Sequence, residues 1–199
     1  MATSGISRTH MFLLRGSLRC MVAFGWLWFL VPLLTWRNGD AVSWDGQTDH
    51  SQVAPGLHTV RGAAAYWEGQ VHVEVNQPSV GLRLLSWLPE ALVAVAVIVT
   101  GFLLLRLLYE TQAGRPFFAS SASRLRAISL VIGVAAVAVP ITWSTANRAI
   151  LETALRGQVE PHVHVAQMAT WLLVALVVRV VAEAFRIGTR LQDDVEGLV

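Results

Sequence analysis

The chain has 199 residues, of which 54% are hydrophobic and 14% are charged, and its formal net charge is +2. This composition excludes an ordinary soluble domain, which carries fewer apolar and more charged residues. All 15 basic residues are arginines, and they are dispersed along the chain. So small a net charge without a basic cluster argues against direct binding of nucleic acid.

The basic N-terminal segment, residues 1–19, is followed by an uncharged apolar run from Cys20 to Trp36. The run approaches the length that a helix needs to cross a bilayer, so residues 20–36 are the first predicted transmembrane helix. The segment resembles a signal peptide, but no cleavage pattern of small residues follows it. Three further apolar runs follow it instead. We therefore interpret it as a retained helix. The single cysteine, Cys20, excludes an internal disulfide.

Residues 37–86 differ in pattern, because apolar and polar side chains alternate. Val71, Val73 and Val75 alternate with His72 and Glu74, which is the spacing of a β-strand. Together with residues 63–67 they predict a hairpin, and turn signals at 44–46 and 55–56 predict a sheet of three or four strands. So small a unit buries little, and we expect it to rest on the ends of the helices.

Three more membrane spans are predicted after this insert. They are residues 87–110, 125–145 and 162–185, with a cytoplasmic loop at 111–124 in which Ser120 or Ser121 caps the third helix. The connection 146–161 is expected to continue the third helix outside the membrane, because apolar side chains at 150, 151, 154 and 155 share one side. Gly157 is expected to end it. Residues 186–199 form the tail.

The arginines predict the orientation, because positive residues in short loops stay on the cytoplasmic side. With the N-terminus inside, the inner segments together with the inner ends of the spans hold ten arginines and the outer segments five. The predicted fold is therefore mainly α: a four-helix transmembrane bundle with a small extracytoplasmic β-rich insert between helices 1 and 2. Both termini are expected in the cytoplasm, with the chain in the cell inner or plasma membrane.

No arrangement of residues for catalysis is found in the sequence. Gly-rich phosphate loops, Ser/His/Asp sets and paired catalytic carboxylates are absent, so we expect neither an enzyme nor a cofactor. Five histidines and several acids fall on the predicted outer side, but their spacing does not match a zinc motif, and solvated surface is favoured over a metal site. Glu90 is a possible ligand or ion site, although it also suits the positive end of a helix dipole.

Charged residues gather at the predicted inner ends of the helices. Arg106 and Glu110 are four residues apart, as are Arg179 and Glu183, so each pair is expected to form along its own helix. An interfacial lipid anchor and a docking surface for a cytoplasmic protein both fit this pattern. The candidate docking residues are Arg115, Arg124, Arg126, Arg179, Glu183, Arg186, Arg190, Asp193, Asp194 and Glu196.

Two inner segments resemble a known family. The stretch Gly-Arg-Pro-Phe-Phe at 114–118 with Arg124 and Arg126, and the end of the chain from Ala184-Phe185-Arg186 to residues 191–199, are similar to the bacterial four-span membrane family catalogued as domain of unknown function 2975. The resemblance implies no activity. It implies pairing with a small helix-turn-helix transcription regulator, that is, a cytoplasmic DNA-binding partner.

Two functions from different classes follow. The preferred one is a non-catalytic regulatory or sensory membrane partner of such a regulator, in contact with the lipid bilayer. The alternative is a transport or channel component, a homo-oligomer in which Glu90 or the inner charge pairs line a pathway. Few polar groups lie inside the predicted spans, and this favours the regulator.

Overall fold

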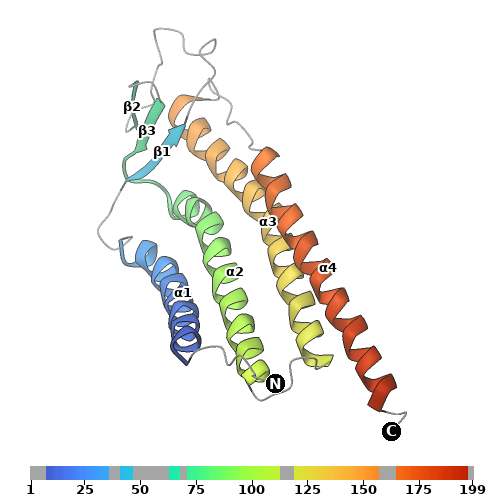
Figure 1. The fold of residues 1–199 in the computed structure, drawn as a ribbon. Helices are drawn as coiled ribbons and strands as arrows, with labels where there is room; N and C mark the ends of the chain where they lie inside the picture. Colours follow the sequence, from blue (N-terminus) through green and yellow to red (C-terminus); the bar gives the residue numbers. More distant parts are fainter. Residues whose placement is uncertain are drawn as a thin grey trace. The chain divides into compact units, whose positions relative to one another are not determined.

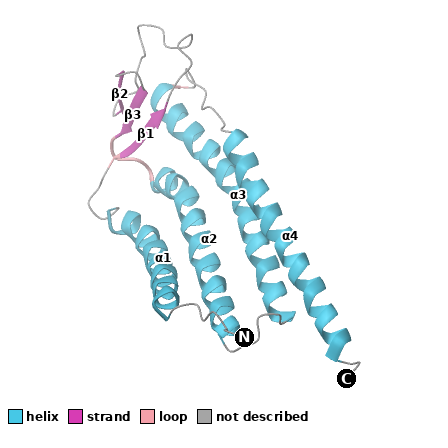
Figure 2. Cartoon of the chain, in the orientation of Figure 1, coloured by secondary structure: helices cyan, strands magenta, loops and turns pink. Residues whose placement is uncertain are grey.

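The computed structural model describes residues 8–35, 41–46, 63–67, 71–112, 119–156 and 165–196. The fold is mainly helical (Figures 1 and 2). Its four helices are α1 (Arg8–Thr35), α2 (Val80–Gln112), α3 (Ala119–Leu155) and α4 (Val165–Glu196). Its three strands, β1 (Val42–Gly46), β2 (Ala63–Trp67) and β3 (Val71–Val75), lie between α1 and α2 in the sequence.

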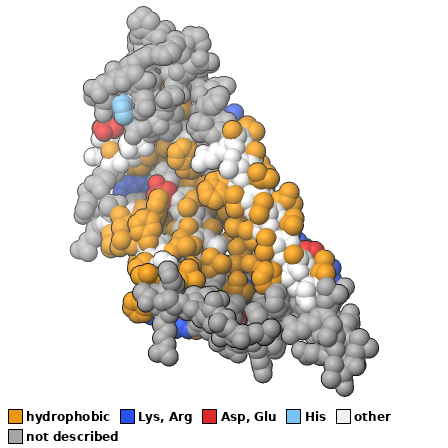
Figure 3. All heavy atoms as spheres, in the orientation of Figure 1, with side chains coloured by type: hydrophobic (Ala, Val, Ile, Leu, Met, Phe, Trp, Pro, Cys, Tyr) orange, Lys and Arg blue, Asp and Glu red, His pale blue; other side chains and the backbone are white. Residues whose placement is uncertain are grey.

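All four helices are long and apolar enough to cross a membrane. Large apolar side chains stay exposed along them, among them Leu34 at 70%, Leu130 at 67% and Leu173 at 61%. Figure 3 shows hydrophobic side chains gathered over the helices on the face that it draws. A soluble monomer rarely exposes so much apolar surface, whereas lipid accommodates it. These features indicate a multi-pass membrane protein.

The chain forms two compact units, and each helix contributes to both. The first unit contains residues 1–27, 94–136 and 169–199, and the second contains residues 28–93 and 137–168. The first holds the N-terminal parts of α1 and α3 and the C-terminal parts of α2 and α4. The second holds the opposite parts of the helices together with the sheet.

The sheet in the second unit is antiparallel, with β3 between β1 and β2. β2 pairs with β3 in the register Trp67 to Val71, which confirms the predicted hairpin. The prediction of a turn at residues 44–46 is wrong, because these residues belong to β1, where Trp44 lies opposite Val73 and Gly46 opposite Val71. The second expected turn, at 55–56, lies outside the described residues.

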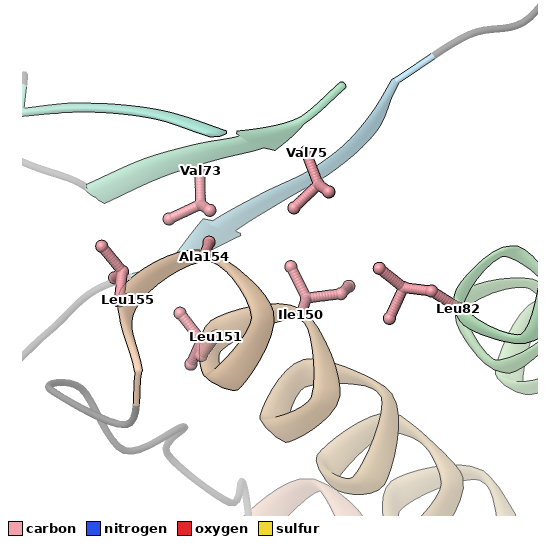
Figure 4. Packing of buried hydrophobic residues seen from close by; sticks show 7 residues of the cluster. All are labelled: Val73, Val75, Leu82, Ile150, Leu151, Ala154 and Leu155. Carbon is pink, nitrogen blue, oxygen red and sulfur yellow. The ribbon is translucent and has the colours of Figure 1, made fainter. Parts of the chain in front are cut away.

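The core of the second unit joins the sheet to α3, as expected. Val73 and Val75 of β3 are buried, whereas Glu74 between them is exposed. The two valines face one side of α3, where Ile150 and Leu151 are also buried (Figure 4). The cluster is completed by Ala154 and Leu155 of α3 and Leu82 of α2, with Val42 and Ala149 packed against it. A three-stranded sheet thereby buries one face against a helix.

The continuation of the third helix is confirmed as far as Leu155. Arg148, Glu152 and Arg156 are exposed, opposite the buried apolar side. Arg156 adopts a left-handed conformation with φ of 52°, and its N–H donates to the carbonyl of Glu152 at 3.2 Å. Gly157, which was expected to end this helix, lies outside the described residues. The positive φ in the described part of this helix end belongs to Arg156.

The first unit is held together by close helix packing at small residues. A Cβ added to Gly25 of α1 would lie 2.8 Å from Cγ1 of Ile98, and one added to Gly101 of α2 would lie 2.8 Å from Cγ2 of Val22. α1 and α2 therefore approach closely where neither glycine has a side chain. On α3 and α4, the buried hydroxyl of Ser129 donates to the carbonyl of Ala175 at 2.9 Å.

The helix bounds differ from the predicted spans. α1 begins at Arg8, although residues 1–19 were assigned to the N-terminal segment, and α2 begins at Val80, although residues 80–86 were assigned to the insert. α4 continues through residues 186–196, which were assigned to the tail. α3 begins at Ala119, so Ser120 and Ser121 lie within its first turn and neither caps it. The hydropathy pattern detects the apolar part of a helix and misses the polar turns beyond it.

Candidate functional site

The charged side chains of the first unit gather at the ends of the helices within it. We call this group the arginine-rich end. It comprises Arg15 and Arg19 of α1, Arg106 and Glu110 of α2, Arg124 and Arg126 of α3, and Arg179, Glu183 and Arg186 of α4. Seven of these nine side chains are basic. The arginine-rich end therefore has a large excess of positive charge.

The first ion pair joins α2 to α3. Nη2 of Arg124 lies 2.5 Å from Oε1 of Glu110, and both side chains are partly exposed. The prediction that Glu110 pairs with Arg106 is wrong, because the guanidinium of Arg106 lies over the ring of Phe102, with Cζ 4.8 Å from the centroid. Arg106 and Glu110 thus each have a different partner from the one that helical spacing favours.

The second group of ion pairs joins α3 to α4. Nη2 of Arg126 donates to Oε2 of Glu183 at 3.2 Å, and Nε of Arg186 donates to Oε1 at 2.7 Å. Nη2 of Arg186 also contacts Oε1. Both oxygens of Glu183 are therefore occupied by arginines, one from each helix. The expected partner, Arg179, is exposed and forms no ion pair within the described part of the chain.

Beneath these pairs lies the apolar core of the first unit. Leu125, Ile128 and Ala182 are buried, and side chains of α2, α3 and α4 pack around them. The surrounding residues are Leu103, Leu104, Leu107, Ile132, Val178 and Phe185. Because α3 and α4 are packed this way one turn from Arg126 and Glu183, the charged groups stand on rigid elements.

A third contact, which the sequence reasoning missed, joins α1 to α2 through Tyr109. Cζ of Arg15 lies 4.9 Å from the centroid of the Tyr109 ring, and Nη2 of Arg19 donates to the Tyr109 hydroxyl at 3.0 Å. The available signal was the four-residue spacing of Arg15 and Arg19, which places both on one face of a helix. No sequence pattern indicated which helix that face contacts.

The remaining candidate docking residues are placed only in part. Arg190, Asp193, Asp194 and Glu196 all lie in α4, so the acidic residues near the C-terminus are carried on a helix. Their side chains are outside the described part of the structure, as is the whole of Arg115. The predicted docking surface is therefore defined by side-chain positions only at Arg124, Arg126, Arg179, Glu183 and Arg186.

Glu90 is exposed and follows the buried Pro89. The helix dipole was expected to favour a carboxylate at this position, but α2 begins at Val80, about 15 Å earlier along the axis at 1.5 Å per residue. The dipole acts within the first turn, so it gives Glu90 little stabilisation. The position is that of a carboxylate within an apolar span.

Among the residues that the structure describes, no group of three or more His, Cys, Asp or Glu side chains could hold a metal ion. His72 lies in β3 and is partly exposed. The other outer histidines named by the sequence pattern, at 50, 58, 162 and 164, lie outside the described residues.

No model of a protein family, no curated protein and no solved structure matches the chain. The resemblance to the bacterial four-span family stays a prediction that rests on residues 114–126 and 184–199.

Proposed function

We propose that the chain is a non-catalytic regulatory membrane protein whose arginine-rich end faces the cytoplasm and docks a soluble partner. In this proposal both termini are cytoplasmic, and the sheet lies on the opposite, extracytoplasmic side of the membrane. The arginine distribution supports this orientation, because positive residues are retained on the inner side. A signal received by the sheet would reach the partner through the helices.

One observation carries the docking proposal, and it is the length of α4. The residues of α4 after Gly188, Thr-Arg-Leu-Gln-Asp-Asp-Val-Glu, are mostly polar, yet the helix continues through them to Glu196, a further rise of about 12 Å at 1.5 Å per residue. The added turns include Arg190, Asp193 and Asp194. A helix of mixed charge that extends past the apolar span suits a protein partner, since an anionic leaflet attracts arginines and repels carboxylates.

The class of partner comes from the resemblance, which implies a small helix-turn-helix regulator. The ion pairs support a surface of defined shape, because Glu183 holds Arg126 of α3 and Arg186 of α4 in fixed positions. A regulator bound there would be kept at the membrane, and a change in the helices would release it.

Glu90 supports the second candidate, a transport or channel component. An exposed carboxylate inside an apolar span is costly against lipid, and such residues commonly mark an ion pathway. The other charged groups of α2 are Arg83, seven residues earlier, and Arg106 and Glu110 toward its C-terminal end. These groups lie on a single helix of one chain, so this candidate predicts a homo-oligomer in which several copies line the pathway.

The test of docking neutralises the acids on the extension of α4. The variant Asp193→Asn/Asp194→Asn/Glu196→Gln should keep its expression level and topology but lose its partner when tagged protein is purified from native membranes at moderate salt. The control variant, Glu74→Gln/Glu152→Gln, neutralises two exposed acids of the second unit. It should retain the partner.

The identity of the co-purifying protein shows which class of partner the chain docks. The proposal requires a co-purifying protein with a helix-turn-helix domain, measured by quantitative mass spectrometry. Retention of that protein at the wild-type level by the triple variant would exclude the end of α4 from the interface. Equal loss from both variants would show that any reduction of negative charge releases the partner.

A further inference from the structure

Two arginines of α1 converge on one tyrosine of α2. Arg15 lies over the Tyr109 ring, with Cζ 4.9 Å from its centroid, and Arg19 donates to the Tyr109 hydroxyl at 3.0 Å. All three residues belong to the first unit. The ring supports one guanidinium by a cation–π contact while the hydroxyl positions the other. The contacts hold two positive charges about one helical turn apart.

No carboxylate of the described residues balances these two charges. The sequence has no Asp or Glu before Asp40, so α1 supplies no acid of its own. The nearest acid along α2, Glu110, pairs with Arg124, and Glu183 of α4 pairs with Arg126 and Arg186. The Tyr109 hydroxyl accepts from one donor of Arg19. The remaining guanidinium donors suit an anion from outside the chain.

The position of the arginines along α1 indicates which anion. Phe12, Leu13 and Leu14 are exposed on the N-terminal side of Arg15, and Phe24 and Leu27 are exposed beyond Arg19. From Leu34 the helix rises about 22 Å to Arg19 and about 28 Å to Arg15 at 1.5 Å per residue. The hydrocarbon core of a bilayer is about 30 Å thick. Both rises are shorter than this thickness, so Arg15 and Arg19 lie within the apolar span near its N-terminal end. Arginine side chains are long enough to extend from such a position to the lipid phosphates of the nearer leaflet.

We propose that Arg15, Arg19 and Tyr109 form a binding site for the phosphate of an anionic phospholipid headgroup in the leaflet at the arginine-rich end. The planar guanidinium matches two phosphate oxygens, and the Tyr109 ring fixes Arg15 so that less side-chain freedom is lost on binding. The exposed apolar residues on both sides favour a lipid over an acidic peptide, because a bound acyl chain lies along them. The site uses α1 and α2 of the arginine-rich end, whereas the candidate docking residues with described side chains lie on α3 and α4.

The test measures lipid binding to the purified full-length protein by native mass spectrometry. Phosphatidylglycerol and phosphatidylcholine are each titrated into detergent solution. The variant Arg15→Gln/Arg19→Gln should bind phosphatidylglycerol about tenfold or more weakly, because two charge-assisted hydrogen-bond donors are lost. Its affinity for phosphatidylcholine should change less.

A matched control removes the same charge elsewhere. Arg106→Gln/Arg179→Gln neutralises two exposed arginines of the same end, of which one lies over Phe102 and neither forms an ion pair with the residues described. The proposal expects this variant to bind phosphatidylglycerol within about twofold of wild type. Equal weakening in both double variants would overturn the site in favour of general attraction to positive charge.

A second variant distinguishes the loss of a specific binding site from misfolding of the protein. Tyr109→Phe keeps the ring under Arg15 but removes the acceptor of Arg19, and it should weaken phosphatidylglycerol about two- to fivefold. Unchanged binding would remove Tyr109 from the site. Titration of inorganic phosphate in the absence of added lipid tests whether free phosphate, and not a lipid headgroup, is the ligand of the two arginines. Binding of phosphate alone with the same dependence on Arg15 and Arg19, and none of lipid, would overturn the lipid assignment.

Discussion

At the scale of single residues, the alternation of side chains in β3 proved informative. The pattern Val-His-Val-Glu-Val placed the valines on one face, and Val73 and Val75 are buried against α3 as expected. The partners of the charged residues were not predictable in the same way. Spacing along one helix favoured Arg106 for Glu110, whereas the structure uses Arg124 of the neighbouring helix. A sequence pattern ranks partners within one helix and carries no information on rotation between helices.

The burial of Val73 leads to a prediction. Val73→Asp would place a carboxylate without a partner in the cluster of Ile150, Leu151 and Leu155, at a cost of about 3–5 kcal/mol. The sheet should separate from α3 and become sensitive to protease, which limited proteolysis of the purified protein would detect. The neighbouring variant Glu74→Lys alters an exposed position of the same strand and should leave the cleavage rate unchanged.

If Val73→Asp were cleaved at the wild-type rate, Val73 would not face the core. The packing of the sheet against α3 would then be wrong.

At the scale of elements, four apolar helices and a sheet were predictable because length and periodicity report them directly. The strand β1 was not, because Trp44-Asp45-Gly46 has the composition of a turn. Pairing with β3 from Val42 opposite Val75 to Gly46 opposite Val71 overrides that local preference. The polar ends of α2 and α4 escaped prediction for a related reason, since they are helical without being apolar.

The close approach of α1 and α2 leads to a second prediction. Gly25→Leu would force a side chain into the space of Ile98 and should destabilise the helix pair by about 1–3 kcal/mol. The pair Val22→Cys/Gly101→Cys, in a Cys20→Ser background, reports the distance, because a Cβ at Gly101 lies 2.8 Å from Cγ2 of Val22. The disulfide of this double-cysteine protein should form readily when Gly25 is present and poorly when Gly25→Leu is added.

Gly16→Leu is the matched control for this measurement, because nothing lies within 4 Å of a Cβ at Gly16. It should leave the disulfide yield unchanged. An equal yield with Gly25→Leu and with the parent would contradict the packing of α1 against α2 at Gly25.

At the scale of the whole molecule, the proposed function depends on which side of the membrane each segment occupies. Apolar length predicts how many helices can cross, and the four helices agree with it. The direction of the helices comes from the arginines alone, of which ten lie on the predicted inner side and five on the outer side. The docking surface and the sheet acquire their proposed roles only if this direction is correct.

Labelling of single cysteines in intact cells tests this claim most directly. In a Cys20→Ser background, Gly56→Cys, Gly114→Cys, Gly157→Cys and Val199→Cys are each exposed to a maleimide that does not cross membranes. We expect labelling at Gly56 and Gly157 in intact cells, and labelling at Gly114 and Val199 only after the membrane is permeabilised. Labelling at Gly114 or Val199 in intact cells would contradict four spans with both termini in the cytoplasm.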